Sequence, residues 1–187
     1  SSECQKYIED YLSALGFKTE YIKYGDVQNM ISTLGAGSPC LIFVGHTDVV
    51  PPGDLSKWKY NPYELTQDQG MLIGRGSADM KGGIACFMSA VNEYCKIRDD
   101  IKGSIKIILT GDEEGDAVNG IRKIIDQNIF KVGDLDYCLV GEPSSSDEIG
   151  DVIRNGRRGS ITGHLTVHGI QGHVAYPEKA KNPIHLC

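Results

Sequence analysis

A short apolar run that ends in two polar side chains is the feature that most constrains the fold of this chain. Residues 41–44 read Leu-Ile-Phe-Val, with Pro39 before them and His46 and Asp48 shortly after them. A strand that is apolar on both faces is typical of a parallel sheet, because helices cover both faces of such a sheet. The run therefore predicts a buried parallel strand over residues 41–46 and an α/β fold.

His46 and Asp48 follow at the carboxyl end of this predicted strand, which is where open α/β sheets bind their ligands. Residues two apart in an extended chain lie on the same face. One of the two could therefore bind a metal while the other orients the imidazole. The alternative is a polar strand end whose side chains are simply solvated, and the pair alone leaves both interpretations open.

Other periodic segments predict the elements around this strand. Apolar residues at helical spacing predict helices over residues 3–15, 84–97 and about 117–128. Runs rich in β-branched and apolar residues predict strands near residues 17–24, 27–34, 104–110 and 135–140.

Acidic residues follow the last two of these predicted strands. They are Asp112, Glu113, Glu114 and Glu142. Such a run can be a solvated turn or the acidic start of the next helix, where the helix dipole favours carboxylates. However, all three apolar strands deliver an acid or a histidine at their carboxyl ends, which favours a shared crevice at one edge of the sheet.

A glycine-dense segment before the second predicted helix supplies one more carboxylate, Asp79. The segment matches neither of the glycine-rich patterns that bind phosphate, and Asp79 at its centre would repel an anion. Glycines at this density allow the backbone to come close to another group, such as a ligand or a neighbouring segment. We therefore interpret Asp79 as a metal ligand.

Convergence of these side chains would place five carboxylates around one imidazole. The predicted cluster is His46, Asp48, Asp79, Glu113, Glu114 and Glu142. Like charges at close range raise one another's pKa values unless a cation neutralises them. Oxygen ligands with an imidazole suit Zn²⁺, Co²⁺ or Mn²⁺, and the lack of thiolates argues against a purely structural zinc. Of the two adjacent glutamates, one could bind metal while the other acts as general base on a metal-bound water.

Composition argues against several other classes of protein. A chain of 187 residues, 40% of them hydrophobic, can form one domain with part of a second. The net charge of -6 argues against a nucleic-acid surface, and no apolar run reaches the roughly 20 residues of a membrane span. No leader is recognisable at the N-terminus. Six scattered cysteines without a C-x-x-C pair favour reduced thiols, so we expect a cytoplasmic protein.

The motifs together resemble the M20 family of cocatalytic zinc peptidases. They are residues 45–51, 74–82, 112–115 and 141–144. Residues 157–160 and 163–177 resemble most closely the branch of the family that hydrolyses N-succinyl-LL-2,6-diaminopimelate in bacterial lysine synthesis. The resemblance implies a mostly parallel sheet flanked by helices, followed by the start of an α+β lid and dimerisation domain.

The resemblance also implies a role for each residue of the cluster. Two zinc ions, for which Co²⁺ or Mn²⁺ can substitute, would be bound by His46 and Glu142 at one position, Glu114 at the other and Asp79 at both. Asp48 would orient His46. Glu113 would take a proton from the bridging water and pass it to the leaving amine. The peptide bond after Asp79 is cis in relatives.

Four residues further along the chain resemble the substrate side of such a site. His173 would stabilise the oxyanion of the reaction from the lid domain of a partner subunit in a homodimer. Arg157, Ser160 and Tyr176 resemble substrate contacts, and the forked guanidinium of Arg157 suits a carboxylate. Ser160 and Tyr176 could also be ordinary turn and strand residues.

The chain departs from the family in length, because relatives are about twice as long and carry a late histidine that completes the second zinc site. His185 lies in no matching motif. We therefore expect a fragment with a second zinc site that is incomplete and with poor activity of its own. Residues 1–158 would form a catalytic domain without its C-terminal segment, and residues 159–187 the beginning of the lid and dimerisation domain.

The expected activity of the parent protein is hydrolysis of N-succinyl-LL-2,6-diaminopimelate to succinate and LL-2,6-diaminopimelate. The alternatives are another M20 amidohydrolase, such as an acetylornithine deacetylase or a dipeptidase, and a non-catalytic metal-binding relative. The presence of Glu113 argues against the last, because a binding protein has no need of a carboxylate aimed at the water. No G-x-S-x-G motif supports a serine hydrolase.

Overall fold

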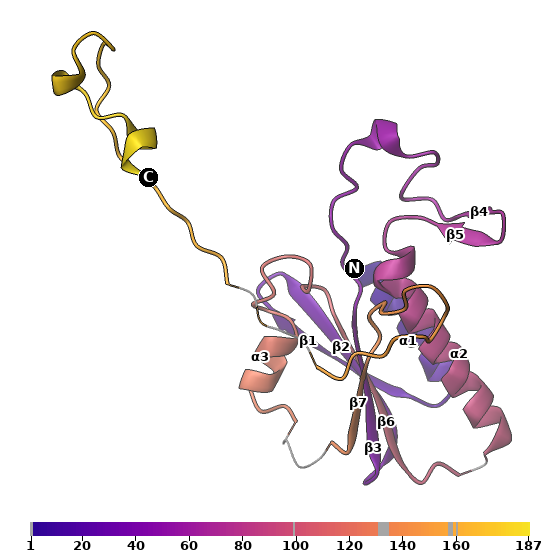
Figure 1. Ribbon diagram of the computed structural model, residues 1–187. Helices are drawn as coiled ribbons and strands as arrows, with labels where there is room; N and C mark the ends of the chain where they lie inside the picture. Colours follow the sequence, from indigo (N-terminus) through magenta and orange to yellow (C-terminus); the bar gives the residue numbers. More distant parts are fainter. Residues whose placement is uncertain (1, 99, 131–134, 157–158, 160) are drawn as a thin grey trace. The chain divides into compact units, whose positions relative to one another are not determined.

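The computed structural model describes the whole chain except residues 1, 99, 131–134, 157–158 and 160 (Figure 1). The chain divides into two compact units, Ser1–Ser144 and Ser145–Cys187. The division into a catalytic domain of residues 1–158 and a second domain of residues 159–187 stays a prediction. None of the helices in the described ranges is both long enough and apolar enough to cross a membrane.

A five-stranded sheet forms the centre of the first unit, with the strand order β1-β2-β6-β3-β7. The strands are β1 (Lys18–Tyr24), β2 (Val27–Ala36), β3 (Cys40–His46), β6 (Gly103–Thr110) and β7 (Tyr137–Val140). β3 pairs in parallel with β6 and with β7, whereas β2 pairs antiparallel with β1 and with β6. Because only β2 runs against the others, the sheet is mostly parallel in direction, and the predicted α/β fold is confirmed.

Helices lie against both faces of this sheet, as the apolar β3 sequence predicts. The helices are α1 (Ser2–Ala14), α2 (Gly82–Ile97) and α3 (Ile121–Asp126). Adjacent residues of β3 point to opposite faces. Phe43 packs with α1 and α2 in one apolar core, and Ile42 packs with α3 in another. Each such buried side chain stabilises the fold by about 1.5–3 kcal/mol.

Short elements connect these parts of the first unit. They are the turn η1 (Leu55–Lys57), the hairpin of β4 (Thr66–Asp68) and β5 (Met71–Ile73), and the turn η2 (Ser77–Lys81), which leads directly into α2. The glycine-dense turn lies where the sequence predicts it, directly before α2. The peptide bond between Asp79 and Met80 in η2 is cis.

The third helix is shorter than the predicted 117–128, and the reason is a carboxylate upstream of it. The side chain of Asp112 accepts hydrogen bonds from the main-chain N–H groups of residues 117, 118 and 119, at 3.0–3.2 Å. These N–H groups are therefore held in a loop, and Gly120 before the helix has a non-helical backbone. The helix can begin only at Ile121.

The second unit contains no strand within its described residues. Its regular elements are the short turns η4 (Pro177–Lys179) and η5 (Pro183–Leu186), and Ile170 forms a single bridge with Lys181. The lid domain that the resemblance implies would open with a strand, and none forms among these described residues. An extended segment becomes a strand only when another strand pairs with its main-chain groups, and Ile161 and Leu165 are exposed here.

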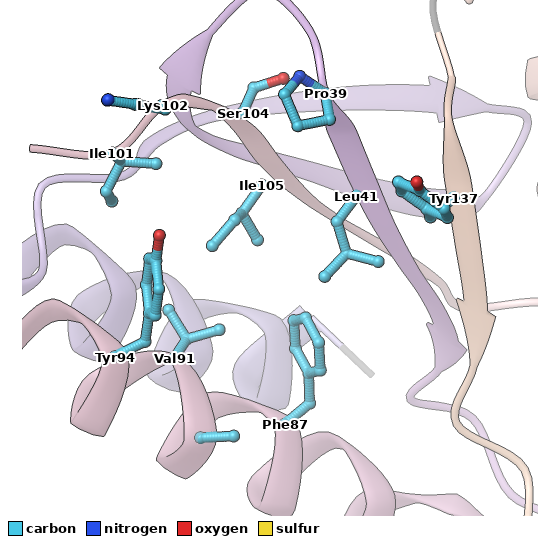
Figure 2. A pocket seen from close by; sticks show the side chains of 11 residues that line it. Pro39, Leu41, Phe87, Val91, Tyr94, Ile101, Lys102, Ser104, Ile105 and Tyr137 are labelled. Atoms are coloured by element: carbon cyan, nitrogen blue, oxygen red, sulfur yellow. The ribbon is translucent and has the colours of Figure 1, made fainter. Parts of the chain in front are cut away.

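An apolar cavity of about 310 Å³ lies between α2 and the sheet (Figure 2). Leu41 of β3 and Ile105 of β6 line it from the sheet, and Phe87 and Tyr94 line it from α2. These strand residues belong to the amino-terminal ends of β3 and β6. The cavity is therefore at the opposite end of the strands from His46.

Close approach of α2 to the end of β7 yields a test of the packing. An added Cβ at Gly83 would meet the main-chain oxygen of Gly141. We expect Gly83→Ala to lower the free energy of unfolding by about 1–3 kcal/mol, measured by urea denaturation. Gly163→Ala is the control, because a Cβ there meets no atom within 4 Å. Equal unfolding midpoints for the two variants would contradict the contact.

Candidate metal centre

The carboxyl ends of three parallel strands meet at one edge of the sheet. His46, the last residue of β3, is in register with Thr110, the last residue of β6, and Val44 is in register with Val140 of β7. The loop after β6 carries Glu113 and Glu114, and Glu142 follows β7 by two residues. Parallel pairing therefore brings three distant sequence motifs to one place, as the sequence predicts.

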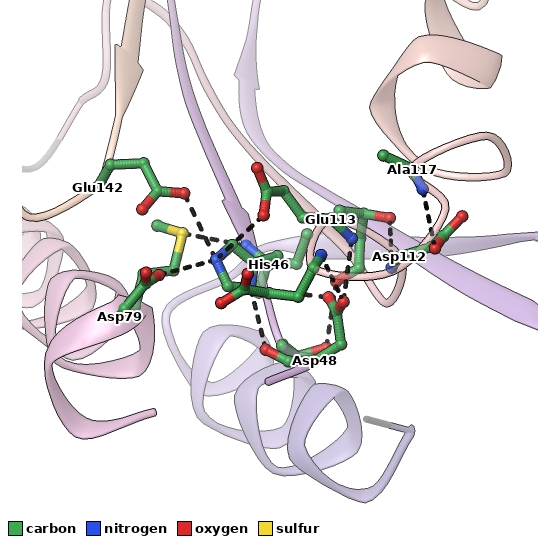
Figure 3. A network of polar contacts seen from close by, with 12 residues as sticks. His46, Asp48, Asp79, Asp112, Glu113, Ala117 and Glu142 are labelled. Atoms are coloured by element: carbon green, nitrogen blue, oxygen red, sulfur yellow. Dashed lines mark hydrogen bonds and ion pairs between the residues drawn. The ribbon is translucent and has the colours of Figure 1, made fainter. Parts of the chain in front are cut away.

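His46 is the centre of this cluster, and only 1% of its surface is exposed. Its Nε2 lies 3.1 Å from Asp79 Oδ1, 3.4 Å from Glu142 Oε1 and 4.0 Å from Glu113 Oε2 (Figure 3). Its Nδ1 lies 3.0 Å from the main-chain oxygen of Asp48. Since a carbonyl oxygen can only accept, Nδ1–H donates to it. In the neutral imidazole, Nε2 then presents a lone pair to the carboxylates, as a metal ligand must.

Asp48 contacts both His46, which it is predicted to orient, and the loop after β6. It holds His46 through its main-chain oxygen, while its carboxylate Oδ1 is 3.6 Å from Nδ1. The other carboxylate oxygen, Oδ2, accepts hydrogen bonds from the main-chain N–H groups of Glu113, at 3.0 Å, and Glu114, at 2.9 Å. Asp48 thus ties the end of β3 to the loop after β6.

Asp79 reaches the cluster from η2, and the residue after it anchors the turn. Met80 is fully buried, and its Sδ accepts a hydrogen bond from the main-chain N–H of His46 at 3.2 Å. An added Cβ at Gly45 would meet the Met80 side chain. The glycine before His46 therefore lets Met80 lie directly against β3. This contact fixes the position from which the preceding residue, Asp79, reaches the cluster.

The donor atoms of the described cluster fit a divalent metal. They form two groups, within each of which the ligand atoms are no more than 4.8 Å apart. These groups are His46 with Glu113 and Glu142, and His46 with Asp79 and Glu114. An imidazole with carboxylate oxygens suits a zinc-like ion. Both adjacent glutamates reach a possible metal position, so these distances are compatible with either of them as the ligand.

Mutual repulsion of the carboxylates is visible in their pKa values. Burial raises the pKa of Glu142 and of Glu114, and the negative charge of Asp79 raises each of them further. Burial acts to lower the pKa of His46. The hydrogen bond to the Asp48 carbonyl and the charges of Glu142 and Asp48 outweigh this effect and raise that pKa. The cluster therefore favours an added positive charge, which a proton or a metal ion can supply.

Two of the remaining predicted site residues lie in the second unit. The rings of His173 and Tyr176 have centroids 6.0 Å apart, and the His173 Nδ1 accepts a hydrogen bond from the N–H of Ala175. Both side chains are exposed, and their roles stay predictions. Arg157 and Ser160 lie outside the described residues.

Sequence reasoning missed three buried residues that support the cluster: Gln5, Thr47 and Met80. Thr47 and Met80 are next to the predicted ligands His46 and Asp79, and only those ligands were predicted as site residues. Gln5 carried a readable signal, because it shares the apolar face of α1 with Ile8 and Leu12. A polar residue on such a face needs a hydrogen-bond partner inside the protein.

Comparison with known proteins agrees with this fold and identifies the family. The model of Peptidase family M20/M25/M40 matches residues 42–182, and the chain belongs to this family. Succinyl-diaminopimelate desuccinylase of Hydrogenovibrio crunogenus is 52% identical over 97% of this chain and 48% of its own length. The enzyme of that name from Nitrosomonas eutropha is 48% identical over 98% of this chain and 49% of its own length. The chain spans about half the length of these curated relatives.

Solved structures of other proteins share the architecture. Human carnosine dipeptidase 1 is 26% identical, with a TM-score of 0.64 over 73% of this chain and 31% of that protein. The M20 metallo-carboxypeptidase Sso-CP2 from Sulfolobus solfataricus is 22% identical, with a TM-score of 0.66 over 75% of this chain and 32% of that protein. The second similarity concerns the fold alone.

The pKa shifts predict how stability depends on pH without metal. The raised pKa of His46 gives stability that is complete below its ordinary value of 6.5 and is lost as the pH rises through the raised value. Glu114 and Glu142, whose pKa values folding raises, oppose folding increasingly as the pH rises above their ordinary value of 4.5. All three contributions therefore have the same sign.

We expect the free energy of unfolding, measured by urea denaturation with a chelator present, to fall between about pH 5.5 and about pH 8. Glu142→Gln removes one of the charges that raise the pKa of His46, so its pH dependence should be weaker. Stability that is constant or that rises over this range would contradict the electrostatic description of the cluster.

Proposed function

We propose that the whole protein is a metal-dependent amidohydrolase that removes the succinyl group from N-succinyl-LL-2,6-diaminopimelate. The observation that carries the proposal is the convergence of carboxylates from several elements on the Nε2 of one buried histidine. The choice of substrate is supported by relatives named succinyl-diaminopimelate desuccinylase, which are 46–52% identical over nearly the whole chain. The products are succinate and LL-2,6-diaminopimelate.

In this proposal, four residues of the cluster hold two divalent ions. His46 and Glu142 would hold one ion, Glu114 the other, and Asp79 would contribute to both. Zinc, for which Co²⁺ or Mn²⁺ can substitute, would polarise the amide carbonyl and make the attacking water more acidic. Nε2 of His46 presents its lone pair at this position because Nδ1 keeps the ring proton and donates it in a hydrogen bond to the Asp48 carbonyl.

Glu113 is the proposed general base. Its side chain is 47% exposed, and its carboxylate comes within 4.0 Å of His46 Nε2, at the solvent side of the cluster. It would remove a proton from the attacking water and deliver it to the nitrogen of the leaving amine. The hydrogen bond from its N–H to Asp48 fixes its main chain while the side chain stays free to move the proton.

Residues beyond the metal cluster complete the proposed site. His173, from the lid domain of a partner subunit in a homodimer, would stabilise the oxyanion. Arg157, Ser160 and Tyr176 would contact the substrate, and the Arg157 guanidinium suits a substrate carboxylate. We also propose that the enzyme is cytoplasmic and that its partner is the small succinylated substrate, with no nucleic acid or membrane.

A dipeptidase is the second candidate, because a solved dipeptidase, human carnosine dipeptidase 1, shares this fold at 26% identity. The higher identity to desuccinylases favours the first candidate. An acetylornithine deacetylase is a further alternative within the family. Hydrolysis rates for N-succinyl-LL-2,6-diaminopimelate, N-acetylornithine and a dipeptide, measured on the same whole protein, would separate the three.

Metal binding is the first consequence to test. The chain should bind zinc in calorimetric titration, and His46→Gln should weaken that binding by more than about 100-fold. His164→Gln, an exposed histidine of the second unit, is the matched control and should bind as the unmodified chain does. A His46→Gln variant that is folded by circular dichroism and binds zinc normally would rule out the proposed centre.

The general base can be tested separately from metal binding. In the whole protein, Glu113→Gln should keep its zinc affinity and lose about 10²–10⁴-fold in kcat on the succinylated substrate, because an amide cannot accept the proton. Glu20→Gln, an exposed carboxylate of β1, should keep full activity. Turnover by Glu113→Gln at the normal rate would exclude Glu113 as the base.

A further inference from the structure

A glutamine of the N-terminal helix is fully buried beneath the metal centre. Gln5 has no exposed surface, and it lies on the same face of α1 as Ile8 and Leu12. Burial of an amide is unfavourable unless its hydrogen-bonding groups find partners. The partners of Gln5 therefore indicate what the residue is for.

The Gln5 side chain connects three strands near the ends that form the site. Its Nε2 lies 3.1 Å from the main-chain oxygen of Gln28 in β2, 3.4 Å from that of Leu109 in β6, and 3.3 Å from Oγ1 of Thr47, directly after β3. Its Oε1 accepts a hydrogen bond from the Gln28 side chain at 3.1 Å. Every polar atom of the amide is engaged.

Thr47 carries this network into the metal centre, because it lies between His46 and Asp48. Its N–H and its hydroxyl both donate to the main-chain oxygen of Thr110, at 2.9 and 3.3 Å. Since that hydroxyl proton points to Thr110, the oxygen lone pairs of Thr47 can accept the N–H of Gln5. Thr110 Oγ1 in turn accepts from the N–H of Asp112, the residue before Glu113.

We propose that Gln5 is a positioning residue of the metal centre. It donates a hydrogen bond to the turn between His46 and Asp48 and thereby sets the position of that turn relative to the end of β6. Without the amide, the acceptors at Thr47 and Leu109 would lose a buried donor, and the turn would no longer be fixed at the ligand. The inference rests on the proposed function, since it takes the cluster at His46 to bind metal.

The test compares two variants of α1 that lose different interactions. Gln5→Met keeps the length of the side chain and removes its hydrogen bonds. Leu12→Ala, at a buried apolar position of the same helix, removes packing and leaves the hydrogen bonds in place. Both variants should unfold at a lower temperature, so stability alone does not separate a positioning residue from a structural one.

Metal binding separates these two roles. Titrated with Co²⁺ and with Zn²⁺ well below its unfolding temperature, Gln5→Met should bind about 10–100-fold more weakly than the unmodified chain and show an altered Co²⁺ absorption spectrum. Leu12→Ala should keep the affinity and the spectrum. A Gln5→Met variant that binds like Leu12→Ala would overturn the inference.

Amide hydrogen exchange without metal provides an independent measurement. In Gln5→Met, protection should fall selectively at Thr47, Glu113 and Glu114 relative to the rest of β3 and β6, whereas a uniform loss would overturn the inference. If the whole protein binds no metal, the proposed function fails, and hydrogen exchange on this chain still decides whether Gln5 positions the turn after β3. If Gln5→Met does not fold, Thr47→Val breaks the same network from its other end and should give the same metal and exchange results.

Discussion

Repulsion among carboxylates around a single buried imidazole is the constraint on which the arrangement of this chain depends. Separate elements must hold these groups together against their charge: His46 comes from β3, Asp79 from η2, and Glu142 from the segment after β7. Folding therefore places an electrostatic cost at one edge of the sheet, seen in the raised pKa values of Glu114 and Glu142. A bound cation removes that cost, so metal binding and stability of the fold are thermodynamically linked.

Each part of the cluster is held by contacts that do not involve the predicted ligand atoms. Met80 in η2 accepts a hydrogen bond from the N–H of His46, Gln5 donates to Thr47 in the turn after β3, and Asp112 accepts hydrogen bonds within the loop that precedes α3. These supports are buried or engage main-chain groups, whereas the carboxylates of Asp79 and Glu113 stay about half exposed. The supporting contacts are thus buried or made by the main chain, whereas the carboxylates themselves are accessible to solvent.

Local pattern predicted most of the fold and the composition of the cluster. The apolar run of β3, the helical spacing of α1 and α2, and the acids after β6 and β7 are readable because each depends on neighbouring residues. The predicted length of α3 was wrong, because the side chain of Asp112 accepts hydrogen bonds from main-chain N–H groups several residues further along the chain. The contacts of Gln5 escaped notice, because one of its acceptors is 104 residues distant in sequence. The absence of a strand among the described residues of the second unit has the same cause, since strand formation depends on a partner.

Asp48 binds the loop of Glu113 and Glu114 through their N–H groups, which every residue except proline possesses. The place of these two residues is therefore independent of what their side chains are. Exchange of a carboxylate there for imidazole or thiolate would alter the hardness of the donor set while the main chain stays where it is. The loop thus keeps its main-chain position whichever side chains it carries at these two positions. A scaffold of this kind can therefore change its metal preference by single substitutions.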